Sequence, residues 1–329
     1  FLNFFMPEGL DAACLALVLG STLSEIASFL CLFLLYLHDK RKLKANLYQD
    51  TNYTKQILKI SFPIAITSYI RSGLSTLKQI LIPLQLEKSG MSCEYAISRY
   101  GMINGMVMPL ILFPCTFINS FSGLLIPEFS YMQAKKSYRK MEIAFEKIFK
   151  VSFLFSFFIL GVFWCFSQEL SSMIYQEPEI AKFVKILAPL IVLMYIDSIV
   201  DSILKGLDKQ VIVMGINIVD LVVSISFIYF LLPSSGVVGY IIVLYISEIL
   251  NGLVSLWFLW KETHFYFDIG NWLIKPLLSL LLSSFALSIL PPVSSSSFIG
   301  VCIEILLFGV CYFLFLCLFK AVQKEDMKI

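Results

Sequence analysis

Three polar side chains within a long apolar segment could together hold an anion. Arg71 and Lys78 lie seven residues apart, or two helical turns, so both project from one helix face together with Ser75. A charged side chain near the middle of a bilayer costs at least ~2.5 kcal/mol. We therefore expect this cationic face to line a watery cavity or to meet protein partners. Such a cavity would attract an anionic ligand, for example a diphosphate.

Carboxylates lie at comparable depth in other apolar segments. They are Asp197, Asp201, Asp220, Glu248 and Glu25. These groups either neutralise the two cationic residues in buried pairs that hold the helices together, or bind Na⁺ or H⁺ as coupling ions. Because a spacing pattern does not fix the rotation of one helix relative to the next, both alternatives remain open.

The sequence lacks motifs for catalysis or metal binding. Its eight cysteines include no CxxC pair, and its histidines, His38 and His264, fall in or beside expected cytoplasmic loops. The patterns GxSxG and HExxH and the phosphate-binding P-loop do not occur. A net charge of +2 is too small to indicate a nucleic-acid partner. We therefore expect no enzyme, no bound metal and no nucleic-acid partner.

The composition indicates that these segments lie in a membrane. Hydrophobic residues make up 58% of the 329 residues, charged residues make up 15%, and the mean hydropathy is +0.84. A water-soluble core cannot bury so much apolar side chain. Because about 20 apolar residues in a helix cross the hydrocarbon layer, we predict an all-α polytopic membrane protein with nine transmembrane helices. They span residues 10–37, 57–86, 102–126, 151–166, 186–204, 211–232, 237–259, 272–290 and 298–319.

Basic residues divide the expected loops into two alternating sets. One set is rich in Lys and Arg, as in residues 40–44, whereas the opposite set carries more Glu. Because basic loops remain in the cytoplasm, the first helix should end there. Nine crossings then leave the C-terminus in the cytoplasm, in agreement with Lys324 and Lys328 in the tail.

The connection formed by residues 128–150 carries its own helical pattern. Met141, Ala144, Phe145 and Ile148 recur at helical spacing, with lysines on the opposite face. We interpret this stretch as a short amphipathic helix that lies in the membrane interface and links two spans, in preference to a regulatory site.

Several of these segments resemble one family in their order and spacing. They are ILKISFPIAITSYIRSGLSTLKQILIPLQLEKSG, YGMINGMVMPLILFPCTFINSFSGLLIPEFS, NIVDLVVS and YISEILNGLVSLWFL. They are similar to the stage V sporulation protein B family of oligosaccharide flippases, within the multidrug/oligosaccharidyl-lipid/polysaccharide exporter superfamily. The resemblance covers essentially the whole chain.

This resemblance implies an architecture of fourteen helices, with two six-helix lobes and two additional helices. The nine predicted spans would be helices six to fourteen, with most of the N-terminal lobe missing. Residues 1–37 would hold the tail of helix five and the last helix of that lobe, and residues 38–56 a cytoplasmic linker. Residues 57–260 would form the C-terminal lobe, and residues 261–329 the two additional helices and a cytoplasmic tail.

The resemblance also implies a function. Family members would move a lipid-linked oligosaccharide or peptidoglycan precursor across the plasma membrane of a spore-forming bacterium by alternating access. Arg71, in an RSGL stretch typical of the family, would hold the sugar diphosphate together with Lys78 and Ser75. Leu84 and Gln85 stand where relatives often carry basic residues, so no basic rim is expected there. The expected partners are this lipid-linked substrate and membrane lipids, with the chain itself a monomer.

Two other functions remain as alternatives. A cation-coupled drug exporter of related fold would favour an acidic, aromatic cavity, against which Arg71 and Lys78 argue. A membrane scaffold that organises cell-wall synthesis without transport would use the intramembrane charges for structure alone.

Overall fold

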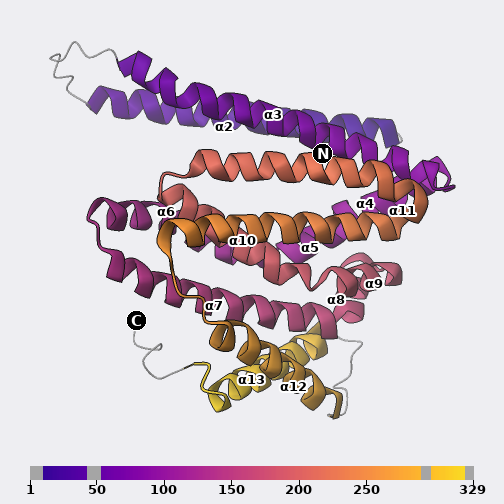
Figure 1. Cartoon of the computed structure of the whole chain (residues 1–329). Coiled ribbons are helices and arrows are strands. Elements are labelled where there is room, and N and C mark those ends of the chain that lie inside the picture. Colours follow the sequence, from indigo (N-terminus) through magenta and orange to yellow (C-terminus); the bar gives the residue numbers. More distant parts are fainter. Residues whose placement is uncertain (1–9, 43–52, 290–297, 323–329) are drawn as a thin grey trace. The chain divides into compact units, whose positions relative to one another are not determined.

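The computed structural model describes residues 10–42, 53–289 and 298–322, and every regular element among them is a helix. The chain divides into two compact units, Phe1–Leu58 and Lys59–Ile329. Figure 1 shows the elements, which are α2 (Leu10–Lys42), α3 (Tyr53–Lys88), α4 (Cys93–Met102), η2 (Ile103–Val107), α5 (Met108–Leu112), α6 (Cys115–Ala134), α7 (Tyr138–Cys165), α8 (Ser167–Tyr175), α9 (Pro178–Leu187), α10 (Leu190–Gly206), α11 (Gln210–Thr263), η3 (Gly270–Ile274), α12 (Lys275–Ile289) and α13 (Phe298–Leu318).

The first unit is dominated by α2. Its described side chains are mostly exposed, including large apolar ones such as Phe29 and Leu32, which are 66% and 67% exposed. A long run of exposed apolar residues is unfavourable in water and natural in lipid. The stretch Val18–Lys40 is long and apolar enough to cross a bilayer.

Helix α10 lies at the centre of the second unit, where it packs against α6, α7 and α11. Its contact with α6 depends on Gly206. A Cβ atom at this position would lie 2.8 Å from the carbonyl oxygen of Ile126 and 3.0 Å from Cβ of Phe129. The missing side chain therefore allows the two backbones to approach closely, as small residues do in membrane bundles.

A row of aromatic residues fills the core beside α7. Its members recur every four residues, so they share one helix face. The Phe149 ring stacks on Phe265 at 5.3 Å and on Trp272 at 5.6 Å, which ties the connection after α11 to this face. The row consists of Phe145, Phe149, Phe153 and Phe157.

This row changes the interpretation of residues 128–150. The sequence pattern indicated a short interfacial helix followed by a separate span, but α7 is one helix from Tyr138 to Cys165. Met141 and Phe145 are only 5% and 2% exposed. They belong to the same four-residue repeat as the aromatic residues of the span, so the apolar face continues into the core without a break.

Two predicted spans are bent at proline. The helices on either side of Phe113 and Pro114 meet at 61°, and α9 and α10 meet at 55° beside Pro189. Proline lacks the N–H group that would continue the helical hydrogen bonds. Pro63, by contrast, lies inside α3.

Helix α11 contains two predicted spans, residues 211–232 and 237–259. Gly236, between them, has φ +55° and ψ −134°, a conformation that is essentially confined to glycine. The helix doubles back on itself (Figure 1), and Ser247 Oγ on the second arm donates to Asp220 Oδ1 on the first at 2.7 Å. Gly236 thereby brings the polar residues of the two arms together.

The helices confirm an all-α polytopic membrane protein, but not the count of nine spans. Five helices of the described chain are long and apolar enough to cross a bilayer, or seven if each bent pair is one span. Two physical reasons explain the difference. Helix α11 counts once although it holds two predicted spans. Helix α3 is not counted, because polar residues such as Arg71 and Lys78 lower its mean hydropathy.

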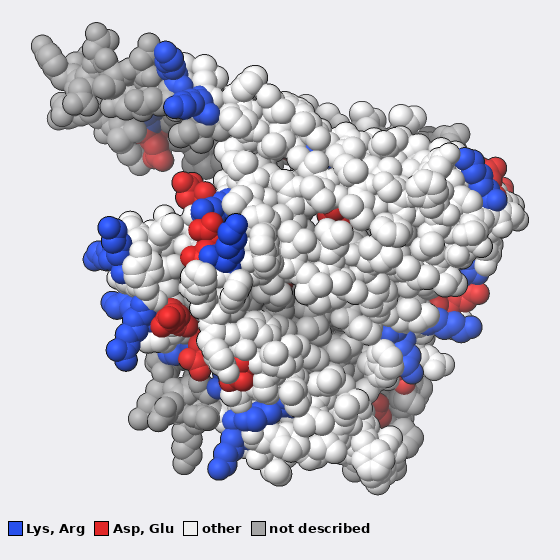
Figure 2. Space-filling model, in the orientation of Figure 1, with Lys and Arg blue, Asp and Glu red and all other residues white. Residues whose placement is uncertain are grey.

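The surface charge fits a membrane environment. On the face seen in Figure 2, Lys, Arg, Asp and Glu side chains lie in separate groups, and a broad region of this face shows almost none. Apolar surface of this extent is expected of helices whose middle parts contact acyl chains.

Candidate functional site

The candidate site is a polar cavity that α3 shares with η2 and α11. Ser75 and Lys78 line it, and its volume is about 430 Å³. On the opposite wall the Asn104 amide donates to Tyr240 Oη at 2.6 Å, and the Tyr100 ring lies 6.0 Å from the Tyr240 ring. We call this space the Lys78 cavity; its other lining residues are Gln79, Ile82, Leu221 and Leu244.

Lys78 lies within electrostatic range of two carboxylates. It is partly buried, and Asp220 and Glu248, one on each arm of α11, partly compensate its charge. Among the described residues it makes no direct ion pair with a carboxylate. The ammonium group therefore has opposite charges nearby while it keeps hydrogen-bonding capacity for another anion.

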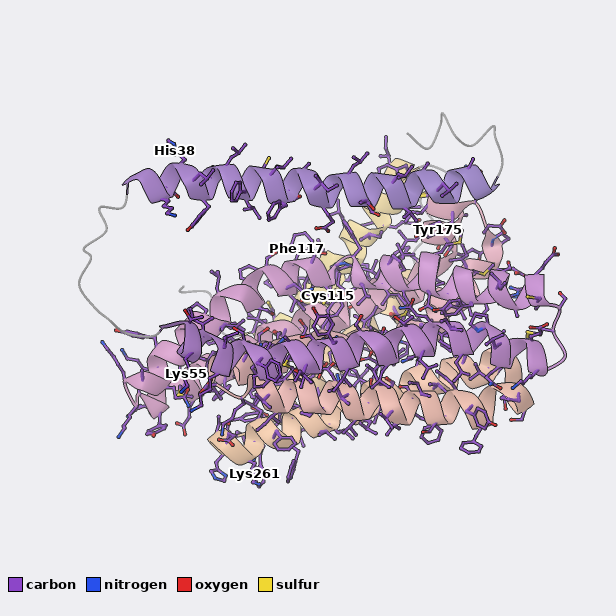
Figure 3. All side chains as sticks on the ribbon, turned by 90° about the horizontal axis from the view of Figure 1, so that it is seen from above. His38, Lys55, Cys115, Phe117, Tyr175 and Lys261 are labelled. Atoms are coloured by element: carbon purple, nitrogen blue, oxygen red, sulfur yellow. The ribbon has the colours of Figure 1, made fainter. Side chains whose placement is uncertain are left out.

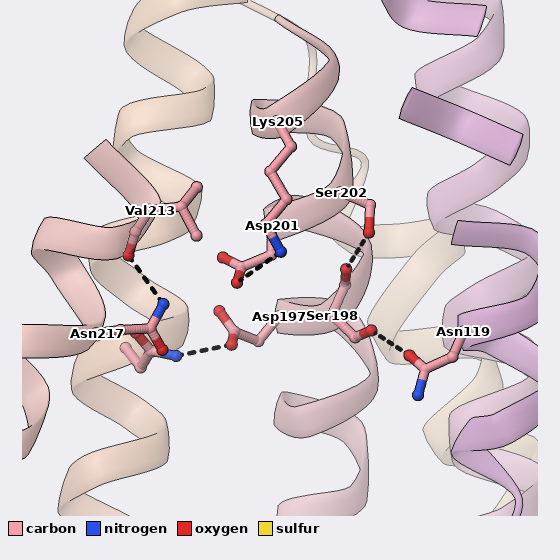
Figure 4. Close-up of polar contacts among 9 residues, drawn as sticks. Asn119, Asp197, Ser198, Asp201, Ser202, Lys205, Val213 and Asn217 are labelled. Carbon is pink, nitrogen blue, oxygen red and sulfur yellow. Dashed lines mark hydrogen bonds and ion pairs between the residues drawn. The ribbon is translucent and has the colours of Figure 1, made fainter. Parts of the chain in front are cut away.

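The two carboxylates of α10 lie one turn apart and have different partners. Asn251 Nδ2 donates to Asp197 Oδ2 at 2.7 Å. Lys205 Nζ lies 3.8 Å from Asp201 Oδ2 (Figure 4). On the neighbouring side of α10, Ser198 Oγ donates to Asn119 Oδ1 at 2.6 Å. Polar contacts thus join α10 to both α6 and α11 within the apolar bundle.

Several side-chain oxygen atoms of this region have no hydrogen-bond partner of regular geometry in the described part of the chain, although Ser255, Asn217 and Ser224 lie near the carboxylates of Asp197, Asp201 and Asp220. These oxygen atoms are Asp197 Oδ1, Asp201 Oδ1, Asn251 Oδ1 and the hydroxyl oxygens of Ser224 and Ser255. Leaving such a group unsatisfied costs about 1–3 kcal/mol. Asp197 Oδ1 and Asp201 Oδ1 are the carboxylate oxygens among them that could accept a proton or a cation. The described residues include no group of three or more His, Cys, Asp or Glu with the geometry of a metal site.

The predicted site residues are only partly brought together. Ser75 and Lys78 share the cavity, whereas Arg71 is exposed and does not line it. Two helical turns separate Arg71 from Lys78 by about 10 Å, and Arg71 instead lies within electrostatic range of Asp201. Glu25 is exposed on α2 in the first unit.

The sequence pattern did not predict the second wall of the cavity. Asn104 and Tyr240 lie 136 positions apart, so only the folded chain brings them into hydrogen-bonding distance. One signal did exist. Asn104 is a polar amide in an otherwise apolar run, and a buried amide in a membrane helix needs a partner.

The fold and this polar region define a helical multi-pass membrane protein with charged groups inside its bundle. A model of the MatE family matches residues 105–230. Stage V sporulation protein B of Bacillus subtilis (strain 168) is 25% identical over 244 residues, which cover 72% of this chain and 47% of that protein. The chain therefore spans about half the length of this curated relative. No solved structure matches the chain.

These matches confirm the resemblance to the stage V sporulation protein B family and the MatE proteins of the same exporter superfamily. The matched range, residues 105–230, begins beside Asn104 and includes the α10 carboxylates and Asp220. This range does not include Lys78, Asn104 or Tyr240 of the Lys78 cavity.

Proposed function

We propose that this chain acts in the translocation of a lipid-linked oligosaccharide or peptidoglycan precursor across the plasma membrane. The observation that carries the proposal is Lys78, a partly buried cation in a polar cavity within an apolar helix bundle. A diphosphate is a strong acceptor for an ammonium group. The amide and hydroxyl groups of Asn104 and Tyr240 on the opposite wall suit the hydroxyl groups of a sugar.

Translocation needs a source of energy, and the carboxylates supply a candidate. We propose that Asp197, Asp201, Asp220 or Glu248 binds Na⁺ or H⁺ during transport, because several oxygens of this region lack partners. Binding of a cation near Asp220 and Glu248 would compete with their attraction to Lys78. Such competition would couple ion binding to the affinity of the site for an anionic substrate.

The setting of the proposed function follows from the charges in the loops and from the relative. Basic loops favour a cytoplasmic C-terminus, and the similarity to stage V sporulation protein B favours a role in sporulation. We propose that the chain acts as a monomer.

The first experiment measures binding of a lipid-linked sugar diphosphate to the purified chain in detergent. The same lipid with a free hydroxyl in place of the sugar diphosphate is the reference ligand. Lys78→Gln should weaken binding about tenfold, the factor for losing one charge-assisted hydrogen bond. Lys182→Gln removes the same charge from an exposed position on α9 and should leave binding unchanged. Equal binding by wild type and Lys78→Gln would contradict the proposed role of Lys78.

The second experiment measures transport and its coupling. The chain is reconstituted in liposomes, and delivery of the lipid-linked sugar to the other leaflet is followed with a membrane-impermeant sugar-binding probe. Asp220→Asn should remove the dependence of the rate on Na⁺ or on pH. If this dependence is unchanged in Asp220→Asn, the carboxylate has a structural role alone.

A further inference from the structure

A second cavity lies between α6 and α7, away from the polar region. Its volume is about 430 Å³. Each of the two helices contributes five residues in the same spacing, i, i+1, i+4, i+5 and i+8, so each presents one continuous face. Ile199 of α10 adds to this lining, and the others are Phe117, Ile118, Phe121, Ser122 and Leu125 on α6, and Lys147, Ile148, Val151, Ser152 and Phe155 on α7. We call this space the α6–α7 groove.

The groove is apolar along most of its length. At one end the Phe117 and Phe155 rings meet edge to face, with centroids 6.4 Å apart. Phe117 is 62% exposed at the side of α6 (Figure 3), and Val151 is 64% exposed. In a membrane protein, an open apolar groove of this kind contacts acyl chains.

Lys147 is the charged residue of the groove and lies away from the aromatic end. About 20 helical residues cross the hydrocarbon layer, and counting back from Cys165 at the end of α7 leads to Glu146. This count places Lys147 near the edge of the hydrocarbon layer, from which its long side chain can reach the lipid phosphates. Its side chain is exposed and forms no ion pair with a carboxylate of the described residues. A cation at this depth attracts an anionic head group.

Ser122 is a second, independent indication of a ligand. It is only 5% exposed, it lines the groove, and its Oγ has no hydrogen-bond partner in the described chain. Ser152, across the groove, instead donates to the carbonyl oxygen of Ile148 at 2.5 Å. An unsatisfied hydroxyl in an apolar groove is unfavourable unless a bound group accepts its hydrogen bond.

The distance between Lys147 and Ser122 along the groove fits a phospholipid. The contacts of Phe129 with Phe145 and of Phe117 with Phe155 fix the register of the two helices, and this register places Ser122 nearly level with Val151. Ser122 is therefore about one turn, or about 6 Å, deeper than Lys147. The ester oxygens of a glycerophospholipid lie just below its phosphate, at a comparable depth.

We propose that the α6–α7 groove binds an anionic glycerophospholipid. Its phosphate pairs with Lys147, an ester oxygen accepts the Ser122 hydroxyl hydrogen, and one acyl chain fills the groove toward Phe117 and Phe155. This site is separate from the Lys78 cavity and does not depend on the proposed transport function.

The test is a titration of the delipidated chain in detergent, followed by native mass spectrometry that counts bound lipids. The probes are palmitoyl-oleoyl phosphatidylglycerol and the phosphatidylcholine with the same chains. Wild type should prefer phosphatidylglycerol. Lys147→Gln should weaken the binding of phosphatidylglycerol about fivefold, the factor for about 1 kcal/mol per basic residue. Phosphatidylglycerol should then bind no more tightly than phosphatidylcholine. Lys182→Gln, which removes an exposed lysine on α9, should have no effect.

Two further variants test the groove itself. Val151→Trp should fill it and reduce binding of both lipids, whereas Val238→Trp, at a residue that is 62% exposed on α11, should not. Ser122→Ala should weaken phosphatidylglycerol binding about threefold, as expected for the loss of one hydrogen bond. Equal binding of the two lipids by wild type, or unchanged binding in both Lys147→Gln and Val151→Trp, would overturn the proposal. So would a change from dimer to monomer in Val151→Trp, because a second copy of the chain would then occupy the groove.

Discussion

The two cavities of the second unit have the same volume, about 430 Å³, and each contains one lysine, yet their chemistry differs. Lys78 is partly buried beside two carboxylates and faces amide and phenol groups. Lys147 is exposed at one end of an apolar groove, away from the aromatic side chains at the other end. A lysine alone therefore does not define a ligand. We expect the groups around each lysine to determine its ligand, a polar head group inside the bundle for Lys78 and a lipid phosphate at the surface for Lys147.

Among the substitutions that should affect one cavity and not the other, the largest effect is expected for Gly236→Ala. Gly236→Ala places a side chain in a backbone conformation that costs about 2–3 kcal/mol, and it disturbs the turn that aligns Asp220 with Ser247. We expect a lower melting temperature and weaker binding in the Lys78 cavity, with lipid binding in the α6–α7 groove retained. Thermal unfolding and the two binding assays measure these effects.

Gly215→Ala is the matched control for this prediction. Gly215 lies on the same helix, and a Cβ atom there would have no neighbour within 4 Å. Alanine is also the better helix former. Equal destabilisation by the two substitutions would show that the conformation of Gly236 has no special role.

A smaller effect should follow from Tyr240→Phe in the Lys78 cavity. The change removes the oxygen that accepts the Asn104 amide and leaves this donor partly buried, which should lower the free energy of unfolding by about 1.5 kcal/mol. Lipid binding in the groove should not change. Tyr229→Phe, at a residue that is 55% exposed, serves as control in the same urea or thermal unfolding measurement. Identical stability of the two variants would argue against a stabilising Asn104–Tyr240 contact.

The corresponding change in the groove is Phe155→Leu. It removes the edge contact with Phe117 and the stacking on Tyr195, which should cost about 1 kcal/mol and widen the aromatic end. Binding of phosphatidylglycerol should weaken while binding in the Lys78 cavity is unchanged. Phe285→Leu, at a residue that is 66% exposed on α12, is the control. If Phe155→Leu instead weakened ligand binding in the Lys78 cavity, the two sites would not be independent.

The smallest effect should lie outside both cavities, at Asp268 before α12. Partial burial acts to raise the pKa of Asp268, but hydrogen bonds from the backbone and side chain of Asn271 outweigh it, so the net pKa is lowered. A carboxylate with a lowered folded-state pKa stabilises the fold above its ordinary value near 4. This contribution is lost as the pH falls through the lowered pKa.

Asp268→Asn provides the comparison for this pH dependence. Wild type should lose stability relative to Asp268→Asn as the pH falls below about 5 and through the lowered pKa of Asp268, as measured by thermal unfolding in detergent. Binding in the α6–α7 groove should be equal in the two proteins. A constant difference in stability across this pH range would mean that Asp268 does not titrate with folding.

Much of the fold could be predicted from the sequence because the bilayer imposes a simple requirement. Each apolar run long enough to cross the hydrocarbon layer must satisfy its backbone internally, so a helix follows from length and composition. The boundaries were less predictable. Met141 and Phe145 fit both an interfacial helix and a buried one, and only their packing against the aromatic core distinguished the two.

The candidate site was predictable to a smaller degree. Helical spacing correctly placed Ser75 and Lys78 on one wall, because neighbours on one helix share a fixed geometry. The same argument failed to bring Arg71 into the cavity, because the wall that α3 contributes runs from Ser75 to Ile82, away from Arg71. It also gave no information about Asn104 and Tyr240, which belong to other helices.

The sequence by itself determined the membrane environment, the helical class and the presence of unusual charges within apolar segments. These properties depend on composition and on periodicity along one helix. The tertiary structure decided which charges meet, that Gly236 folds α11 back so that Ser247 reaches Asp220, and that Ser122 and Lys147 share a groove. Such pairings depend on how each helix is rotated against its neighbours, and this rotation is set by packing throughout the bundle.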